Sequence, residues 1–394
     1  MADGSDSTHP RIPGTVWALG FVSLFMDVSS ELLHSLLPLF LVGSLGLSMV
    51  AVGLIEGIAE ATALIVKVFS GAISDFLGRR KGLVLFGYGL AALSKPLFPL
   101  ATSGETIFAA RLLDRIGKDI RGAPRDALIA DVSPPSIRGA CFGLRQSMDT
   151  VGAFAGPLLA IVLMLWLGNN LPLVFWFACI PAGIAVLAII FFVKEPEQAE
   201  GTQRFRSPIH RDALLSFPAR YWWVVGVGAV FTLARFSEAF LVLRAQDIGL
   251  PMAWTPIVMV VMALVFMLSA YPVGWWSDRT DRTGLLAIGM LLLVAADLLL
   301  AWADSTPLML VGVALWGLHM GFTQGLLATL IADTTPADLK GTAFGVFNLA
   351  SGVAMLLASI LAGWLWQSFG ASWTFLIGAA LAFAALLLLR WRIH

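Results

Sequence analysis

The sequence contains few charged residues. Asp, Glu, Lys and Arg make up 13% of its 394 residues, whereas soluble domains carry about 25%. Hydrophobic residues account for 58%, and the mean hydropathy is +0.86. These values exclude an ordinary soluble domain and indicate a membrane protein. Because the formal net charge is zero, the positions of the charges matter more than their balance.

Cysteine and the common catalytic motifs are also scarce. Cys141 and Cys179 belong to no paired motif, so neither a disulfide framework nor a zinc site is indicated. The chain lacks H-E-x-x-H, G-x-S-x-G and G-x-x-x-x-G-K-S/T, so we expect no enzyme, no cofactor and no bound nucleic acid. The polar opening MADGSDSTHPRIPG does not have the design of a cleavable signal, and we expect the first span to direct insertion itself.

Apolar runs long enough to cross a bilayer recur along the whole chain. A crossing takes about 20 helical residues. The predicted spans are twelve: 14–42, 48–72, 82–101, 105–131, 139–167, 171–193, 219–244, 253–275, 284–303, 307–332, 341–368 and 372–391. About fifteen Lys and Arg residues fall in the loops on the side of both termini, and the opposite loops hold none. We therefore predict a multi-pass protein of the cytoplasmic (inner) membrane with both termini cytoplasmic.

The two halves of the chain resemble each other. The segment ALIADVSPPSIRGACFG from Ala127 matches TLIADTTPADLKGTAFG from Thr329, and GAISDFLGRR from Gly71 matches GWWSDRTDRT from Gly274. A duplicated six-span unit explains both matches. The predicted fold class is an all-α membrane protein with twelve transmembrane helices in two six-helix pseudo-repeats, divided into 1–193, a cytoplasmic linker at 194–218, and 219–394. Transporters of this design bind substrate between the halves, near the bilayer midplane.

With these features the chain resembles the major facilitator superfamily over essentially its whole length. The family's G-x-x-x-D-x-x-G-R-R/K signature is matched by Gly71, Asp75, Gly78, Arg79 and Arg80, and its degenerate second copy by Gly274, Asp278 and Arg282, with Asp281 replacing the expected glycine. The resemblance implies that this cluster latches the outward-facing state. A role in topology and packing alone is the alternative. The resemblance also implies that the protein is a monomer.

Two further patterns resemble parts of this family. RLLDRIGKD resembles the R-L-L-Q-G-I-G-A-G run, in which the arginine at the position of Arg111 is linked to proton coupling. We group Arg111 with the conformational residues. Gly152, Gly156 and Pro157 resemble the G-x-x-x-G-P core of the antiporter branch, which favours export by antiport. Close helix packing by small residues explains both glycines as well.

The fourth span departs from the family pattern, because DRIGKDIRGAPRDALIAD places many charges at membrane depth. An intramembrane charge costs at least about 2.5–3.5 kcal/mol, so these charges require pairing or a water-filled cavity. Helical spacing puts Asp114, Lys118, Arg121 and Arg125 on one stripe. Other charges sharing a helix face are Asp27, Glu31 and His34, then Glu56, Glu60 and Lys67, and then Arg145 and Asp149.

The repeat pairs these charges with mostly neutral residues of the second half, such as Leu327 for Arg125 and Ser351 for Asp149. A requirement of the fold would appear in both halves. This asymmetry favours a function for the charges over a purely structural ion-pair network. Ser237 and Glu238 are an exception, because they match Ser30 and Glu31 in the repeat, and this glutamate pair is compatible with a structural role.

We therefore predict a proton-coupled secondary active transporter of a small polar solute, anionic or zwitterionic, with antiport export favoured over symport uptake. The alternatives are a divalent metal or organic cation transporter using Asp27, Glu31, His34, Glu56 and Glu60, and a hydrophobic-drug exporter. The predicted substrate-binding residues are Arg115, Lys118, Arg121, Arg125, Arg145, Arg235, Gln324 and Asn348. The predicted proton-coupling residues are Asp27, Glu31, His34, Glu56, Glu60, Asp149 and Glu238. The predicted latch consists of Gly71, Asp75, Gly78, Arg79, Arg80, Arg111, Asp278 and Arg282. No resident metal site is expected.

Overall fold

The computed structural model describes residues 11–77, 80–195, 214, 216–277, 279–336 and 339–391, except for the side chains of 71, 72, 75–77 and 391. All regular elements in these ranges are helices. In chain order they are α1 (Gly14–His34), α2 (Leu37–Leu39), η1 (Phe40–Ser44), α3 (Met49–Leu77), α4 (Arg80–Ser94), α5 (Leu97–Leu100), α6 (Gly104–Val132), η2 (Pro135–Ile137), α7 (Arg138–Trp166), α8 (Leu171–Phe192), α10 (Ala219–Ala234), α11 (Ala239–Asp247), η3 (Met252–Trp254), α12 (Ile257–Ser277), α13 (Arg282–Trp302), α14 (Thr306–Asp333), α15 (Lys340–Phe369) and α16 (Ala371–Trp391).

These helices confirm the predicted fold class of twelve spans in two six-helix halves. In the described part of the chain, eleven helical spans are long and apolar enough, by length and composition, to cross a membrane. The twelfth is α6, which has 29 residues but carries the charges of the fourth predicted span. The predicted span 219–244 is divided into α10 and α11, with residues 235–238 between the two helices.

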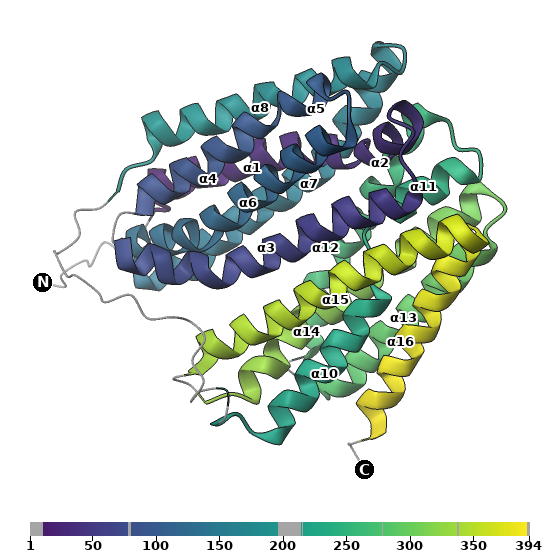
Figure 1. Ribbon diagram of the computed structural model, residues 1–394. Helices are drawn as coiled ribbons and strands as arrows, with labels where there is room; N and C mark the ends of the chain where they lie inside the picture. The colour runs from purple at the N-terminus through teal and green to yellow at the C-terminus, as the bar shows by residue number, and fades with distance from the viewer. Residues whose placement is uncertain are drawn as a thin grey trace, which may run out of the picture.

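The two halves lie side by side as separate bundles (Figure 1). We call α1–α8 the amino-terminal half and α10–α16 the carboxyl-terminal half. The repeat is visible in one matched contact, because Arg80 pairs with Asp131 in the first half and Arg282 Nη1 lies 2.5 Å from Asp333 Oδ2 in the second. Each pair ties the start of one span to the end of another across the same 51-residue separation.

The halves are packed together at one end of the bundle. We call the end where α1 begins and α16 ends the terminal side, and the opposite end the far side. On the far side α3 packs on α15, α2 contacts α11, and η3 contacts α7. Glycines permit this approach, because a Cβ atom at Gly53 or Gly363 would collide with backbone atoms of Ser359 or Met49. The far side is therefore closed.

Part of the predicted organisation lies outside the described residues. Most of the linker predicted at 194–218 lies outside the described residues, so its boundaries stay a prediction. In the structure, α8 ends at Phe192 and α10 begins at Ala219. Among the predicted latch residues, Gly78, Arg79 and Asp278 also lie outside the described residues, as do the side chains at Gly71 and Asp75. Arg80, Arg111 and Arg282 are described.

Candidate functional site: a charged cavity between the halves

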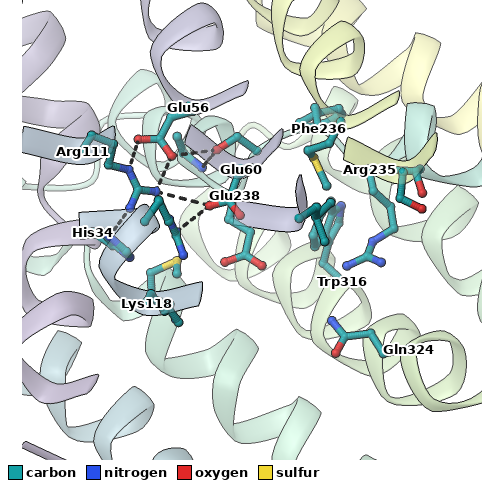
Figure 2. Close-up of a pocket in the computed structure, with 18 of the residues that line it drawn as sticks. His34, Glu56, Glu60, Arg111, Lys118, Arg235, Phe236, Glu238, Trp316 and Gln324 are labelled. Carbon is teal, nitrogen blue, oxygen red and sulfur yellow. Dashed lines mark hydrogen bonds and ion pairs between the residues drawn. The ribbon is translucent and has the colours of Figure 1, made fainter. Parts of the chain in front are cut away.

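A cavity of about 480 Å³ lies between the two halves. We call it the central cavity. Its walls come from α1, α3 and α6 on one side and from the α10–α11 region, α14 and α15 on the other. Figure 2 shows the charged side chains that face it. The carboxylates are those of Glu31, Glu56, Glu60 and Glu238, and the basic groups are those of His34, Arg111, Arg115, Lys118 and Arg235.

The amino-terminal wall of the central cavity is an ion-paired network. Arg111 donates to Glu56 through Nε at 3.0 Å and Nη2 at 2.6 Å, and its Nη2 also reaches Glu60 Oε1 at 3.4 Å. Arg115 Nη2 lies 2.5 Å from the same Glu60 oxygen. Arg111 also contacts His34. Two-pronged arginine–carboxylate pairs are among the strongest hydrogen-bonded ion pairs in proteins, so this wall is largely neutralised within itself.

A second pair lies behind that wall. Lys95 is fully buried, and its Nζ donates to Asp114 Oδ1 at 2.7 Å and to Ser30 at 2.9 Å. His34 Nε2 lies 3.6 Å from Asp114 Oδ2, and His34 Nδ1 lies 3.7 Å from Glu31 Oε1. Asp114 therefore faces Lys95 inside the bundle and is not among the residues that line the cavity, although the helical stripe had placed it with Lys118.

The carboxyl-terminal wall contains the interruption between α10 and α11. Helix α10 ends at Ala234, and α11 begins at Ala239, so residues 235–238 leave the helical hydrogen-bonding pattern beside the cavity. Such discontinuous helices supply binding groups at the midplane of many transporters. Ser237 Oγ reaches across the cavity to Glu56 Oε2 at 3.5 Å. The interruption thus brings the carboxyl-terminal half into contact with the ion-paired wall.

Several side chains around the central cavity have no ionic partner among the described residues. Arg235 and Glu238, the first and last residues of the interruption, and Lys118 on α6 form no ion pair with the described residues, and Arg235 Nε is buried without a hydrogen-bond partner. Figure 2 shows Arg235 close to Trp316 and Gln324, and Lys118 on the opposite wall. The cavity therefore presents two cations and one carboxylate that form no ion pair with the described residues.

A second cavity, also of about 480 Å³, lies nearer the terminal side. Its predicted site residues are Asp27, Lys118, Arg121, Arg125, Arg145, Asp149 and Asn348, and Lys118 and Asn348 border the central cavity too. Arg145 Nη1 pairs with Asp149 Oδ2 at 2.5 Å, and Arg125 donates to Ser23 at 2.9 Å. Arg121 lies 4.1 Å above the ring of Tyr88, and its Nη1 is buried without a hydrogen-bond partner.

The structure thus divides the predicted site residues between two cavities. The central cavity contains Glu31, His34, Glu56, Glu60, Arg115, Arg235, Glu238 and Gln324. The predicted trio on the first span is separated, because Asp27 lines the second cavity and Glu31 and His34 line the central one. In the fifth span Gly152 and Gly156 pack against α1 at these carboxylates, since their missing Cβ atoms would lie 2.9 Å and 2.8 Å from the Cβ atoms of Asp27 and Glu31.

Three residues of the carboxyl-terminal half were not predicted from the sequence, two that line the central cavity and one behind them. Trp316 and Phe236 line the central cavity, but an aromatic residue in an apolar helix gives no distinguishing signal. Asp297 is fully buried behind them and accepts a hydrogen bond from Trp316 Nε1 at 3.0 Å. A single carboxylate in the apolar run 284–303 was a usable signal. Among the described residues, no group of three or more His, Cys, Asp or Glu side chains could hold a metal ion.

Comparison with known proteins identifies the family. The model of the Major Facilitator Superfamily matches residues 19–359 and 239–394. An uncharacterised MFS-type transporter of Methanocaldococcus jannaschii is 32% identical over 383 residues, covering 95% of this chain and 94% of that protein. The inner membrane transport protein YajR of Escherichia coli is 25% identical, covering 94% of this chain and 80% of that protein.

Solved structures agree in fold. The nucleoside transporter NupG superposes with a TM-score of 0.75 at 16% identity, covering 96% of this chain and 100% of that one. The human organic anion transporter MFSD10 gives 0.67 at 19% identity, covering 97% and 100%. At such identities the likeness concerns the fold alone.

Proposed function

Because this chain belongs to the major facilitator superfamily and is a membrane transporter, not an enzyme, we propose that it moves a small anionic or zwitterionic solute by alternating access, coupled to protons. The observation that carries the proposal is the unequal pairing of charges around the central cavity. Arg111 and Arg115 have carboxylate partners, whereas Arg235 and Lys118 have none among the described residues. A solute carboxylate or phosphate supplies the missing partner.

The position of the two unpaired cations supports this solute class. Arg235 belongs to the interruption of the carboxyl-terminal half and Lys118 to α6 of the other half. An anion held by both links the halves across the cavity. Arginine binds carboxylate and phosphate in a forked geometry, and lysine adds a mobile charge. Glu238 faces the same space and would hold the ammonium group of a zwitterion, while Gln324 and Asn348 supply neutral hydrogen-bonding groups.

The second cavity extends this proposal toward the terminal side. Arg121, Arg125 and Arg145 line it, and Lys118 belongs to both cavities. We propose that these arginines form the solute's route between the central cavity and the terminal side. Pairing with Asp149 leaves Arg145 less available than Arg121, whose Nη1 has no hydrogen-bond partner among the described residues.

Proton coupling is assigned to the carboxylates and histidine that contact these cations. Glu60 lies against both Arg111 and Arg115, and Glu31 lies against His34. Protonation of Glu60 or Glu56 would release an arginine toward the solute, and loss of the proton would recapture it. Asp27 and Asp149 are assigned the same role in the second cavity, and Glu238 at the interruption.

The orientation and the direction of transport complete the proposal. We infer that the terminal side faces the cytoplasm, because the lysine- and arginine-rich loops lie there. The closed far side then faces outward. In this state the second cavity lies on the cytoplasmic approach to the central one, which suits loading from inside and export by antiport. Arg80 and Arg282, with their paired aspartates on the terminal side, together with Gly71, Asp75, Gly78, Arg79, Arg111 and Asp278, are assigned to the conformational latch.

A thermal-stability screen of the purified protein tests the solute class. A ligand that binds only the folded state raises its stability by about 2.7 kcal/mol at 100 times the dissociation constant. We expect stabilisation by succinate, glutamate or inorganic phosphate that is lost in Arg235→Gln. Arg279→Gln is the matched control, because Arg279 stacks on Trp275 at the surface, 3.5 Å from its ring centroid, away from both cavities. Equal stabilisation of all three proteins would refute the anion site.

An organic cation is the second candidate, and Glu238 is the observation that favours it. This carboxylate faces the central cavity without an ionic partner among the described residues. A Multidrug resistance protein MdtH, from Photorhabdus laumondii, is 25% identical over 363 residues, covering 88% of this chain and 86% of that protein. Stabilisation by tetraphenylphosphonium that is lost in Glu238→Gln and retained in Arg235→Gln would replace the anion with a cation as solute.

A further inference from the structure

Asp297 is an acidic residue in the middle of the carboxyl-terminal half. It belongs to α13 and is fully buried. Its Oδ1 atom accepts the Trp316 indole N–H at 3.0 Å, and its Oδ2 atom is buried without a hydrogen-bond partner among the described residues. Its side chain forms no ion pair in the described part of the chain. This carboxyl group differs from every paired carboxylate of the amino-terminal wall.

A glycine on the neighbouring helix leaves room for the carboxyl group of Asp297. Gly378 on α16 faces Asp297, and a Cβ atom there would lie 2.7 Å from Oδ2, 3.0 Å from the Phe236 ring and 3.5 Å from the Ala234 carbonyl oxygen. Ala234 is the last residue of α10, so its carbonyl lies where the helical hydrogen bonds stop. The unpartnered oxygen of Asp297 therefore lies beside the interruption that forms the solute wall.

Titratable or charged groups lie on several elements near Asp297. They are His319 and Asp333 on α14, Arg235 and Glu238 at the α10–α11 interruption, Arg244 and Asp247 on α11, and Arg390 near the end of α16. Arg244 donates to the carbonyl oxygens of Leu300, Ala301 and Ala303 at the end of α13 and pairs with Asp247. The His319 ring stacks edge-on to Trp316 at 4.8 Å, and neither of its nitrogens is hydrogen-bonded among the described residues. None of these groups forms an ion pair with Asp297 among the described residues. An isolated ionised carboxylate in such a place is so costly that the group takes up a proton instead.

Trp316 connects this buried acid to the central cavity. Its side chain lines that cavity, and its indole N–H is donated to Asp297. Phe236 lies 6.2 Å from the Trp316 ring, belongs to the interruption, and lines the same cavity. Figure 2 shows both rings next to Arg235. A displacement of the interruption during transport would change the surroundings of Asp297. In turn, a charge on Asp297 would change the relative free energies of the conformations that the interruption adopts.

We propose that Asp297 is a proton-binding site of the carboxyl-terminal half, which holds a proton while it is sealed from water, as in this conformation, and exchanges that proton with water when the interruption moves and the site opens. The inference rests on the proposed proton-coupled transport and adds a carrier outside the amino-terminal network. In the step considered, the O–H bond of the Asp297 carboxylic acid breaks, and its proton passes to water in the opened cavity. The carboxylate that remains gains Arg235 as its counter-ion. One proton leaves the protein, and no electrons are transferred.

Infrared difference spectroscopy of the full-length protein in lipid tests this proposal without knowledge of the solute. The carbonyl-stretch band of a protonated carboxylic acid in a water-poor site is distinct from the bands of a carboxylate. We expect wild-type protein to show such a band, Asp297→Asn to lose it completely, and Asp304→Asn to retain it in full. Asp304 is a suitable control because it is exposed just beyond the end of α13. Asn at 297 keeps an oxygen that can accept from Trp316, so the variant should fold.

A conformational variant separates a proton carrier from a permanently protonated structural acid. Gly53→Trp places a bulky side chain against Ser359 on the far side and should favour the state open to that side. We expect the Asp297 band to fall at least twofold in Gly53→Trp at neutral pH and to return on acidification. A band that is unchanged in Gly53→Trp at every pH, or one that survives Asp297→Asn, would overturn the proposal.

The solute screen remains an independent readout. If succinate, glutamate and phosphate fail to stabilise the protein while the Asp297 band behaves as expected, the anion assignment fails and the proton site stands. If the anions bind and the Asp297 band is insensitive to conformation, the proton site fails and the anion assignment stands. In the supported case Asp297→Asn binds the stabilising anion, and a pH gradient no longer drives its accumulation in proteoliposomes.

Discussion

Replacing Lys95 should distinguish structural from functional charges in the amino-terminal half. Lys95 and Asp114 are 0% and 2% exposed at the side chain, and Nζ lies 2.7 Å from Oδ1. At an effective dielectric constant of about 20, charges this close attract each other by about 6 kcal/mol. Desolvation offsets much of that attraction, so the pair adds little net stability, but removal of one partner leaves a buried charge. Such removal costs about 3–5 kcal/mol.

We therefore expect Lys95→Met and Asp114→Leu each to lower the free energy of unfolding by about 3–5 kcal/mol. The double variant should lie within about 1 kcal/mol of wild type, because replacing a whole buried pair by apolar groups is often neutral. Unfolding in mixed micelles titrated with a denaturing detergent measures all four proteins. His34, 3.6 Å from Asp114, is unchanged throughout the cycle.

The ligand binding of the double variant completes this test. Neither Lys95 nor Asp114 lines the central cavity, so the double variant should keep the anion-induced stabilisation of wild type. The reasoning would be refuted if Lys95→Met cost less than about 1 kcal/mol, or if the losses of the two single variants simply added. Loss of anion binding in a stable double variant would show that this pair belongs to the solute site.

Contacts elsewhere in the molecule give three further predictions. In Gly53→Trp, labelling of a cysteine introduced as Ser359→Cys should rise several-fold, because the far-side contact is opened; unchanged labelling would mean that the contact does not seal the far side. Arg282→Gln should change the free energy of unfolding by less than about 1 kcal/mol, since the partly exposed pair with Asp333 is screened by solvent; a larger loss in thermal melting would contradict this. Tyr88→Phe should cost about 1 kcal/mol in the same melting assay, because its hydroxyl group lies 3.1 Å from Ser23 Oγ, and an unchanged melting curve would show that this contact adds nothing.

Much of the fold could be predicted because hydropathy and duplication act over long stretches. Span edges such as 105–131 and 139–167 agree closely with α6 and α7. The interruption of the seventh span could not be predicted, because ARFSEA contains neither proline nor glycine. Its cause is tertiary, since Ser237 reaches Glu56 of the other half and its N–H is donated to Ser359.

The site was predictable in composition and less so in arrangement. Helical spacing placed Glu31 and His34 on one face, and the structure has them 3.7 Å apart; many of the other predicted charges line one of the two cavities. Helical spacing could not show which charges are paired. Lys95, just after α4, contacts Asp114 on α6, and the sequence alone does not give the orientation of these two helices relative to each other. Nor could it show that Asp27 and Glu31, one helical turn apart, border different cavities.

The number of charges is therefore a poor guide to which of them take part in transport. The amino-terminal half is rich in intramembrane ions, yet Arg111, Lys95 and Arg145 are each held by a carboxylate. The carboxyl-terminal half has few ionisable side chains in its spans, and Arg235 and Asp297 among them have no ionic partner in the described part of the chain. A paired charge can be removed together with its partner at small cost, whereas an unpaired one raises the free energy of the state that contains it. A transporter needs conformational states whose free energies respond to binding of the solute and of the proton. We therefore expect the coupling between solute and proton to depend on the unpaired ionisable groups beside the α10–α11 interruption.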